Sequence, residues 1–314
     1  MTINLHHLRL FASVVEHGGF TKAAGKLNLS QPAISKSLNE LEKQLDVVLM
    51  ERSGRSIRLT DAGRTLFARA SQLFGVERAA EQELRELRGL ERGVLRIGAS
   101  TTIATYMLPL VLGRFHARYP GVRIQASSAN TRSVLRMLLQ FRVDVALVEG
   151  PVSHPQVEVK PWRDDELVVI AAPDHALFAQ SRVDVGELAA QTFLVREPGS
   201  GTRVVSERAL ALHGVRLTKT MRVGGTEAIK QAVAAGLGLG IVSRAAARDQ
   251  LSLGKLAILP VEGLVIRRML TQIRLRGRSS TASARAFELL LEHGEGGESF
   301  PDASGDPGVD SRVL

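Results

Sequence analysis

The 314-residue chain contains no cysteine, which excludes disulfide bonds, cysteine-ligated zinc, iron–sulfur clusters and thiol switches. Its eight histidines never occur as H-x-x-x-H or H-E-x-x-H, so we predict no metal site. No apolar run approaches the roughly 20 residues that span a bilayer. The first residues also lack the basic, apolar and small-residue segments of a signal peptide. We therefore expect a cytoplasmic protein without a membrane partner.

Signatures of catalysis are missing as well. The sequence GLGLGIV (236–242) follows a predicted helix, whereas a dinucleotide-binding fingerprint needs a strand, a glycine-rich turn and then a helix. Ser200 lies in G-S-G and not in the G-x-S-x-G of a hydrolase elbow. We therefore predict that the protein is not an enzyme and has no catalytic residues and no cofactor. A formal net charge of +9 favours a polyanionic partner instead.

The stretch SQPAISKSLNELEKQL (30–45) predicts a helix with one apolar and one polar side. Ser30 is a good N-cap, and Pro32 falls in the first turn, where its missing N–H costs no hydrogen bond. One stripe at helical spacing is apolar: Ile34, Leu38, Leu41 and Leu45. The other side carries groups that read base edges and bind phosphates: Gln31, Pro32, Ser35, Lys36 and Asn39.

The neighbouring segments complete a winged helix-turn-helix. A short upstream helix contains Ala23 and Ala24, whose small side chains allow two helices to cross closely. Downstream, the sequence RSGRSIRLT (52–60) predicts a hairpin with basic groups at Arg52, Arg55 and Arg58. The alternative is an ordinary three-helix surface with a solvated polar face. The order of a small-residue helix, a turn, a capped helix and a basic hairpin favours the DNA-binding interpretation.

Residues 61–92 show a different pattern, that of one long helix with a narrow apolar seam. The seam consists of Leu66, Leu73, Ala80, Leu84 and Leu87, and seven of the 17 residues between them are charged. A seven-residue apolar repeat of this kind is typical of a coiled-coil dimer, although Glu77 interrupts it. The alternative is a lone helix packed on its own domain. Pairing would place two recognition helices in successive major grooves, about 34–36 Å apart or multiples of that.

The segments FTKAAGKLNLSQPAISKSLNELEKQL and LMERSGRSIRLTDAGRTLF strongly resemble the N-terminal domain of LysR-type transcriptional regulators of bacteria. The resemblance covers about residues 4–90, and a looser one extends to about residue 293. It implies base contacts from Gln31, Pro32, Ser35 and Lys36, and phosphate contacts from Arg52, Arg55 and Arg58. Many relatives have Arg where this chain has Lys36, and a lysine cannot make the bidentate guanine contact of an arginine.

From residue 93 onward, buried-strand runs alternate with helices, which predicts parallel α/β layers. The resemblance implies two Rossmann-like subdomains similar to periplasmic binding proteins, with a ligand between them. The predicted fold is therefore α/β with an N-terminal winged helix-turn-helix and a long linker helix. The expected divisions are 1–60 for DNA binding, 61–92 for the linker, 93–293 for effector binding and 294–314 for a disordered tail. Within the effector domain, 93–162 with 267–293 forms subdomain I and 163–266 forms subdomain II.

Three strand-to-helix junctions offer hydroxyl or amide groups at helix N-termini, where free N–H groups and the helix dipole attract anions. They are Ser100-Thr101-Thr102, Asn130-Thr131 and Gly199-Ser200-Gly201-Thr202, and Thr226 marks a weaker fourth. Plain N-capping is the alternative for each junction alone. The three together favour a site for a small anionic effector. Glu149, at the end of a predicted strand, either lines this cleft or is a solvated strand end.

These features predict a ligand-responsive transcriptional regulator. The resemblance implies that it binds promoter DNA as a homodimer and as a homotetramer, with RNA polymerase as a candidate partner. An enzyme built on the α/β domains would need a phosphate-binding loop, a nucleophile elbow or a metal cluster, and none is present. An architectural DNA-binding protein with an inert C-terminal domain is a further alternative, against which the hydroxyl-rich junctions argue.

Overall fold

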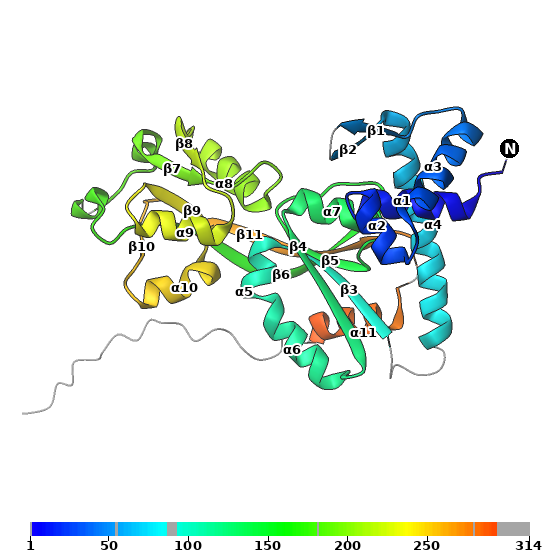
Figure 1. Cartoon of the computed structure of the whole chain (residues 1–314). Helices are drawn as coiled ribbons and strands as arrows, with labels where there is room; N and C mark the ends of the chain where they lie inside the picture. The colour runs from blue at the N-terminus through cyan, green and yellow to red at the C-terminus, as the bar shows by residue number, and fades with distance from the viewer. Residues whose placement is uncertain (1, 54–55, 87–92, 181, 279, 294–314) are drawn as a thin grey trace, which may run out of the picture.

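The computed structural model describes residues 2–53, 56–86, 93–180, 182–278 and 280–293. Its described part comprises a small helical domain, a long helix and a two-lobed α/β domain (Figure 1). The predicted order of helix-turn-helix, long helix and α/β domain is therefore confirmed. The expected disordered tail, residues 294–314, lies outside the described residues.

The N-terminal domain packs three helices against a hairpin. Its elements are α1 (Leu5–Glu16), α2 (Phe20–Leu27), α3 (Gln31–Leu45), β1 (Met50–Ser53) and β2 (Ser56–Leu59). Helix α3 begins as the sequence predicts, because the Ser30 side chain accepts a hydrogen bond from the Ala33 N–H at 3.3 Å. It ends at Asp46, which adopts the left-handed conformation with φ 54°. Phe11, Ala23, Ile34 and Leu41 are fully buried in the core between the helices.

Helix α4 (Asp61–Glu86) joins the two domains. Its 26 residues span about 39 Å at 1.5 Å per residue. The first half packs against the N-terminal core through the buried residues Ala70 and Phe74. The predicted seam residue Leu87 lies outside the described residues.

The α/β domain has two lobes that share one sheet, in the order β4-β3-β5-β11-β6-β9-β7-β8, with β10 paired to β6. Lobe I contains β3 (Gly93–Ser100), β4 (Val122–Ala129), β5 (Val145–Glu149), α5 (Thr101–Tyr106), α6 (Leu108–Arg118), α7 (Thr131–Leu139) and α11 (Ala282–His293). Lobe II contains β7 (Thr192–Val195), β8 (Lys219–Arg222), β9 (Leu239–Ser243), β10 (Ala257–Ile258), α8 (Gly201–Leu212), α9 (Thr226–Ala234) and α10 (Arg244–Ser252). Lobe II also has two short 3₁₀ helices, at Ala176–Ala179 and Val185–Ala190.

Two long strands, β6 (Val157–Ala171) and β11 (Ile266–Leu275), cross between the lobes. Strands β3, β4 and β5 are parallel, and so are β7, β8 and β9, as the alternating pattern predicts. The crossing strands instead run antiparallel to each other and to their neighbours β5 and β9. The sheet is therefore mixed and not wholly parallel. The reason is topological, since the chain enters lobe II along β6 and returns along β11.

Candidate DNA-binding surface and ligand cleft

Helix α3 turns its polar side outward. Gln31, Pro32, Lys36 and Asn39 are exposed and Ser35 is half-buried. Ile34, Leu38 and Leu41 are buried on the opposite side of the helix, against the core of the domain. The candidate base-reading groups thus occupy one accessible face whose orientation is fixed by the leucines behind it.

The predicted basic hairpin is present. Strands β1 and β2 pair antiparallel, with Arg52 opposite Ile57 and Glu51 opposite Arg58. The Arg58 side chain is exposed. Arg52 lies in β1, whereas Arg55 falls outside the described residues. The hairpin therefore presents at least one of the three predicted phosphate contacts to solvent.

Along α4, the seam residues fall into two groups. Leu66 is half-buried and packs against the N-terminal core of its own chain. Leu73, Ala80 and Leu84 are exposed, and Leu84 has 67% of its surface accessible. Glu77, which interrupts the pattern, forms an ion pair with Arg9 of α1 at 2.6 Å. The second half of α4 thus carries the apolar surface that a partner helix would cover.

The four predicted junctions converge where the two lobes meet. From lobe I come the starts of α5 and α7, and from lobe II the starts of α8 and α9. The Arg132 N–H of lobe I donates to the Gly199 carbonyl of lobe II at 3.2 Å. The hydroxyl oxygens of Thr102 and Thr226 lie 3.5 Å apart across the same boundary. The structure therefore brings together residues that belong to separate elements in the sequence.

The lobes approach each other closely at Gly201. A Cβ at this position would overlap the Glu149 carbonyl oxygen of lobe I. The Thr131 hydroxyl donates to the same carbonyl oxygen at 2.8 Å. Ser100, Thr102, Ser200, Thr202 and Thr226 are each at most 3% exposed. The cleft is thus closed, and its polar residues lie in its interior.

N-capping accounts for only part of these residues. Asn130 caps α7 by accepting from the Ser133 N–H at 3.0 Å, and Ser200 caps α8 by accepting from the Arg203 N–H at 3.4 Å. Ser100 stands at the N-cap of α5 without a side-chain capping bond. Its fully buried hydroxyl has no hydrogen-bond partner among the described residues. N-capping therefore accounts for Asn130 and Ser200, but it does not account for the buried hydroxyl of Ser100.

Arg196 is the central cation of the cleft, and the sequence reasoning missed it. Its side chain is 3% exposed, and it donates to the hydroxyls of Thr226 at 2.9 Å and of Thr101, in lobe I, at 3.4 Å. Its Nε and Nη2 also hold the two carboxylate oxygens of Glu197 at 2.9 and 3.1 Å. Arg196 and Glu197 are adjacent in the sequence and follow a predicted strand. The sequence alone does not distinguish this buried pair from an ordinary surface ion pair.

A second buried arginine, Arg268 of β11, joins both lobes and was also missed. It contacts the carboxylates of Glu149 at 2.8 Å and Asp165 at 2.7 Å, and it donates to the Thr202 hydroxyl at 2.9 Å. The contact with Glu149 is an ion pair without hydrogen-bond alignment. Glu149 is 1% exposed, and it also accepts from the Thr102 hydroxyl at 3.3 Å. The alternative of a solvated strand end for Glu149 is therefore wrong.

The carboxylates at the edge of the cleft are held ionised. Burial raises the pKa of Glu197, but hydrogen bonds from Arg196, from the backbone and from Asn130 outweigh it and lower the pKa below its ordinary value. Burial likewise opposes ionisation of Glu227, yet hydrogen bonds from Tyr106, Lys230 and Gln231 lower its pKa to about 2. The Tyr106 hydroxyl of lobe I reaches Glu227 of lobe II at 2.7 Å. Charge therefore helps to hold the lobes together.

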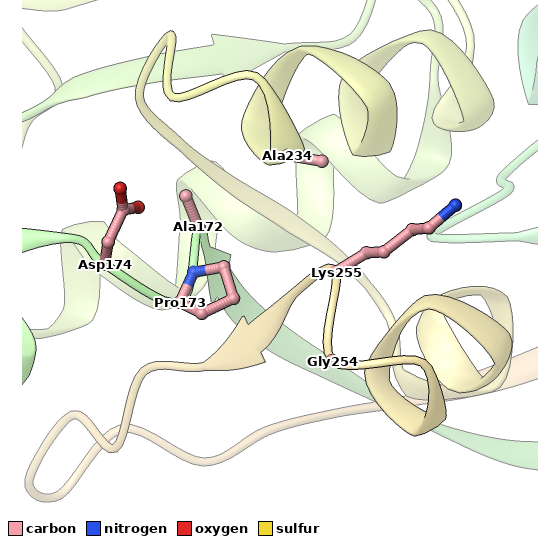
Figure 2. A pocket seen from close by; sticks show the side chains of 6 residues that line it. All are labelled: Ala172, Pro173, Asp174, Ala234, Gly254 and Lys255. Carbon is pink, nitrogen blue, oxygen red and sulfur yellow. The ribbon is translucent and has the colours of Figure 1, made fainter.

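A separate open pocket of about 410 Å³ lies on lobe II, away from these residues. It is lined by Ala172, Pro173, Asp174, Ala234, Gly254 and Lys255. Figure 2 shows the Asp174 carboxylate and the Lys255 ammonium on opposite sides, so they do not converge on a common point. Over the described ranges, no three His, Asp or Glu side chains group in a way that could hold a metal ion. No described helix has the length and apolar character to cross a bilayer.

Two family models match the chain. One, described as "Bacterial regulatory helix-turn-helix protein, lysR family", matches residues 5–64, and the other, "LysR substrate binding domain", matches residues 88–295. The chain is 37% identical to the RuBisCO operon transcriptional regulator of Allochromatium vinosum, over 91% of this chain and 95% of that protein. It is 39% identical to the uncharacterized HTH-type transcriptional regulator YeiE of Escherichia coli (strain K12), over 91% and 96% of the two chains.

Solved structures share the fold. A full-length OxyR variant from Pseudomonas aeruginosa matches with a TM-score of 0.69 at 24% identity, over 93% of this chain and 94% of that one. Full-length CbnR in complex with its target DNA matches with a TM-score of 0.66 at 22% identity, over 92% and 99%. The regulatory domain of CcmR from Synechocystis PCC6803, in complex with 2-PG, matches with a TM-score of 0.59 at 29% identity, over 63% and 96%.

Proposed function

The chain belongs to the LysR-type family of DNA-binding transcriptional regulators, which are not enzymes, and on this basis we propose that a small anion in the interlobe cleft controls its binding to promoter DNA. The observation that carries the proposal is Arg196, a buried guanidinium of lobe II that reaches the Thr101 hydroxyl of lobe I. An anion bound there contacts both lobes and favours the conformation in which they are close.

The charges around Arg196 are consistent with an anionic ligand. Glu149 and Asp165 share Arg268 and so are already paired. Among the described carboxylates, only Glu197, whose side chain is 31% exposed, competes for the Arg196 guanidinium. A carboxylate or a phosphate presents the same pair of oxygens as Glu197 and can take its place on the guanidinium.

The remaining ligand contacts come from the predicted junction residues. We propose that hydroxyls of Ser100, Thr101, Thr102, Thr131, Ser200, Thr202 and Thr226, with Asn130, Glu149 and the backbone at Gly201, form the rest of the site. Ser100 supports this, because its buried hydroxyl lacks a partner in the described part of the chain. The ligand changes the DNA complex only to the extent that it binds one lobe arrangement more tightly than the other.

On the DNA side, we propose that Gln31, Pro32, Ser35, Lys36 and Asn39 face the major groove and that Arg52, Arg55 and Arg58 contact phosphates. Two chains pair through the seam of α4, at the exposed residues Leu73, Ala80 and Leu84, and at Leu87, which lies outside the described residues. Two such dimers form a tetramer. A cytoplasmic location follows from promoter binding in a bacterial regulator, and RNA polymerase is the further partner we propose.

The ligand test is a thermal-shift screen of the full chain against small anions, beginning with 2-PG, inorganic phosphate and sulfate. A bound anion at 100 times its Kd stabilises the folded state by about 2.7 kcal/mol. Arg196→Gln and Thr102→Val should remove the shift. Arg208→Gln, an exposed arginine on helix α8 of the same lobe as Arg196, is the control and should keep it. A full shift in Arg196→Gln, or no shift with any anion of the panel, would contradict the proposal.

The pairing test is Leu73→Glu, analysed by sedimentation equilibrium. A glutamate in an apolar helix seam is buried without a partner and should weaken the dimer at least about tenfold, or roughly 1.4 kcal/mol. Leu253→Glu, an exposed leucine of lobe II, is the control. An unchanged dimer in Leu73→Glu would remove α4 from the interface.

A further inference from the structure

Helix α7 lies between lobe II and the long helix α4 (Figure 1). At its N-terminus, Asn130 contacts Glu197, and Arg132 donates its N–H to Gly199 of lobe II. At its C-terminus, Phe141 meets α4 at Gly75. The nine residues of α7 form a rod of about 14 Å with one end at each place. Motion at one end of such a rod is passed directly to the other.

Phe141 adopts an unusual conformation. Its φ is +56°, and it follows the C-cap of α7, with the Phe141 N–H donating to the Leu138 carbonyl and the Arg142 N–H to the Met137 carbonyl. This pattern is a Schellman motif, in which glycine normally occupies the left-handed position. The other described residues at positive φ, glycines apart, are Asn28 and Asp46, whose short polar side chains tolerate it. A phenylalanine here is locally unfavourable.

Gly75 is also locally unfavourable, since it lies in the interior of α4, where glycine disfavours the helix. A Cβ at residue 75 would overlap the Cβ and Cγ of Phe141. The glycine is thus the socket into which the Phe141 side chain fits. Glycine is unfavourable inside a helix, and phenylalanine is unfavourable at positive φ. The contact between the two side-by-side positions explains both residues.

Further contacts hold this pair from both sides. From α4, the Arg78 guanidinium donates to the Phe141 carbonyl at 3.4 Å. From lobe I, the Arg278 guanidinium lies 4.8 Å from the centre of the Phe141 ring, and it is itself held by Asp144 at 3.0 Å. Phe141 is therefore fixed to the sheet of lobe I while it contacts α4.

We propose that Phe141 and Gly75 form a knob-and-socket joint through which α7 transmits the state of the cleft to α4 and hence to the DNA-binding domain. This inference rests on the proposed role of the cleft around Arg196. A shift of α7, produced when the lobes change their contacts at Asn130 and Arg132, displaces Phe141. The displaced ring pushes on α4 at Gly75, because the socket has no spare room.

The joint itself is tested without any ligand. Gly75→Ala should lower the protection of α4 amides in hydrogen exchange of the full chain by at least about tenfold, because the new methyl group overlaps Phe141. Phe141→Gly removes the knob and suits the left-handed position, so Gly75→Ala/Phe141→Gly should regain protection. Gly113→Ala, at an exposed helix glycine with open space around it, is the control and should lose none. Full protection of the α4 amides in Gly75→Ala, or no recovery of protection in the double variant, would contradict the proposed joint between Phe141 and Gly75.

Transmission from the cleft to the DNA-binding domain is tested by a double-mutant cycle, in which Arg196→Gln and Phe141→Gly are made singly and together. The readout is the affinity and footprint of the full chain on a DNA fragment that the unaltered protein selects from a random pool. Two distant changes without a shared partner are normally additive. The proposal expects them to deviate from additivity by roughly 3- to 100-fold in the DNA-binding constant. His213→Gly, at the exposed C-cap of α8, replaces Phe141→Gly as the control and should be additive with Arg196→Gln.

The outcomes separate the two claims. Additive effects of Arg196→Gln and Phe141→Gly would overturn transmission through the joint. An Arg196→Gln variant with an unchanged DNA complex would overturn the role of the cleft and, with it, transmission. The rescue of Gly75→Ala by Phe141→Gly would still stand as evidence for the packing contact alone.

Discussion

The DNA-facing side of α3 and the interlobe cleft are both polar, but they are built in opposite ways. The side chains on α3 come from one continuous stretch, and all but the half-buried Ser35 are exposed to water. They belong to a helix that packs on its apolar side against the core of the domain. The cleft side chains come from both lobes and both crossing strands, and most of them are buried, including Arg196 and Arg268. Their polar groups bind mostly to one another.

This difference has an energetic consequence. Exposed polar groups exchange water for DNA, so they contribute to binding with little influence on folding. Buried charges have lost their water and depend on their partners, so each one is part of both the fold and the site. Substitutions on α3 should therefore separate function from stability, and substitutions in the cleft should not.

The largest expected effect is the loss of Arg268. Arg268→Met leaves the carboxylates of Glu149 and Asp165 buried without a cation, which should destabilise the protein by about 3–5 kcal/mol. Urea unfolding of the full chain measures this. Arg244→Met, which removes an exposed pair with Glu166, is the control and should cost less than about 1 kcal/mol. Equal losses of unfolding free energy in Arg268→Met and Arg244→Met would contradict the expected difference between buried and exposed ion pairs.

A smaller effect, confined to DNA binding, is expected at Lys36. Lys36→Ala removes an exposed ammonium of α3 and should weaken binding to the selected DNA by about 1–2 kcal/mol relative to random DNA. Its stability should change by no more than about 0.5 kcal/mol. Fluorescence anisotropy with both DNAs and a urea titration give the two numbers.

Two variants sharpen this result. Lys43→Ala, near the C-terminus of α3, should leave selectivity unchanged. Arg58→Ala, on the hairpin, should weaken binding to all sequences alike and reduce its salt dependence, as loss of a phosphate contact does. A uniform loss in Lys36→Ala would instead make Lys36 a phosphate contact.

The smallest effect is expected at Glu227, which is 55% exposed at the edge of the cleft. Its pKa falls from the ordinary 4.5 to about 2, because hydrogen bonds from Tyr106, Lys230 and Gln231 outweigh burial. A lowered pKa stabilises the fold above pH 4.5, and this stabilisation is lost as the pH falls from about 4.5 to about 2. Because the group is largely solvated, the contribution should stay below about 1 kcal/mol.

The measurement is the stability of Glu227→Gln relative to the unaltered chain at pH 6, 4 and 3, by urea unfolding. The deficit should be present at pH 6 and shrink toward pH 3. Glu262→Gln, which removes a surface carboxylate paired with Arg182, controls for a general charge effect. A deficit that grows as the pH falls would reverse the assigned sign.

The sequence predicts many of the residues that form the cleft, but it does not predict which charged groups pair inside it. The junctions at Thr102, Asn130, Ser200 and Thr226 could be predicted because caps and strand ends have local signatures. Arg268, within β11, and Arg196, directly after β7, could not, because an arginine in or next to a strand has no local signature of burial. Glu149 remained ambiguous for the same reason, since a carboxylate at a strand end is buried only if a distant cation meets it.

The sequence by itself determined α3, its cap at Ser30 and its polar face, because these depend on spacing within one helix. It also determined the family and the order of the domains. Only the tertiary structure decided that Arg268 joins Glu149 to Asp165, that Arg196 spans the lobes and that Phe141 fits Gly75. The physical reason is that burial and pairing are properties of neighbours in space, and the chain brings these neighbours together only after two strands have crossed between the lobes.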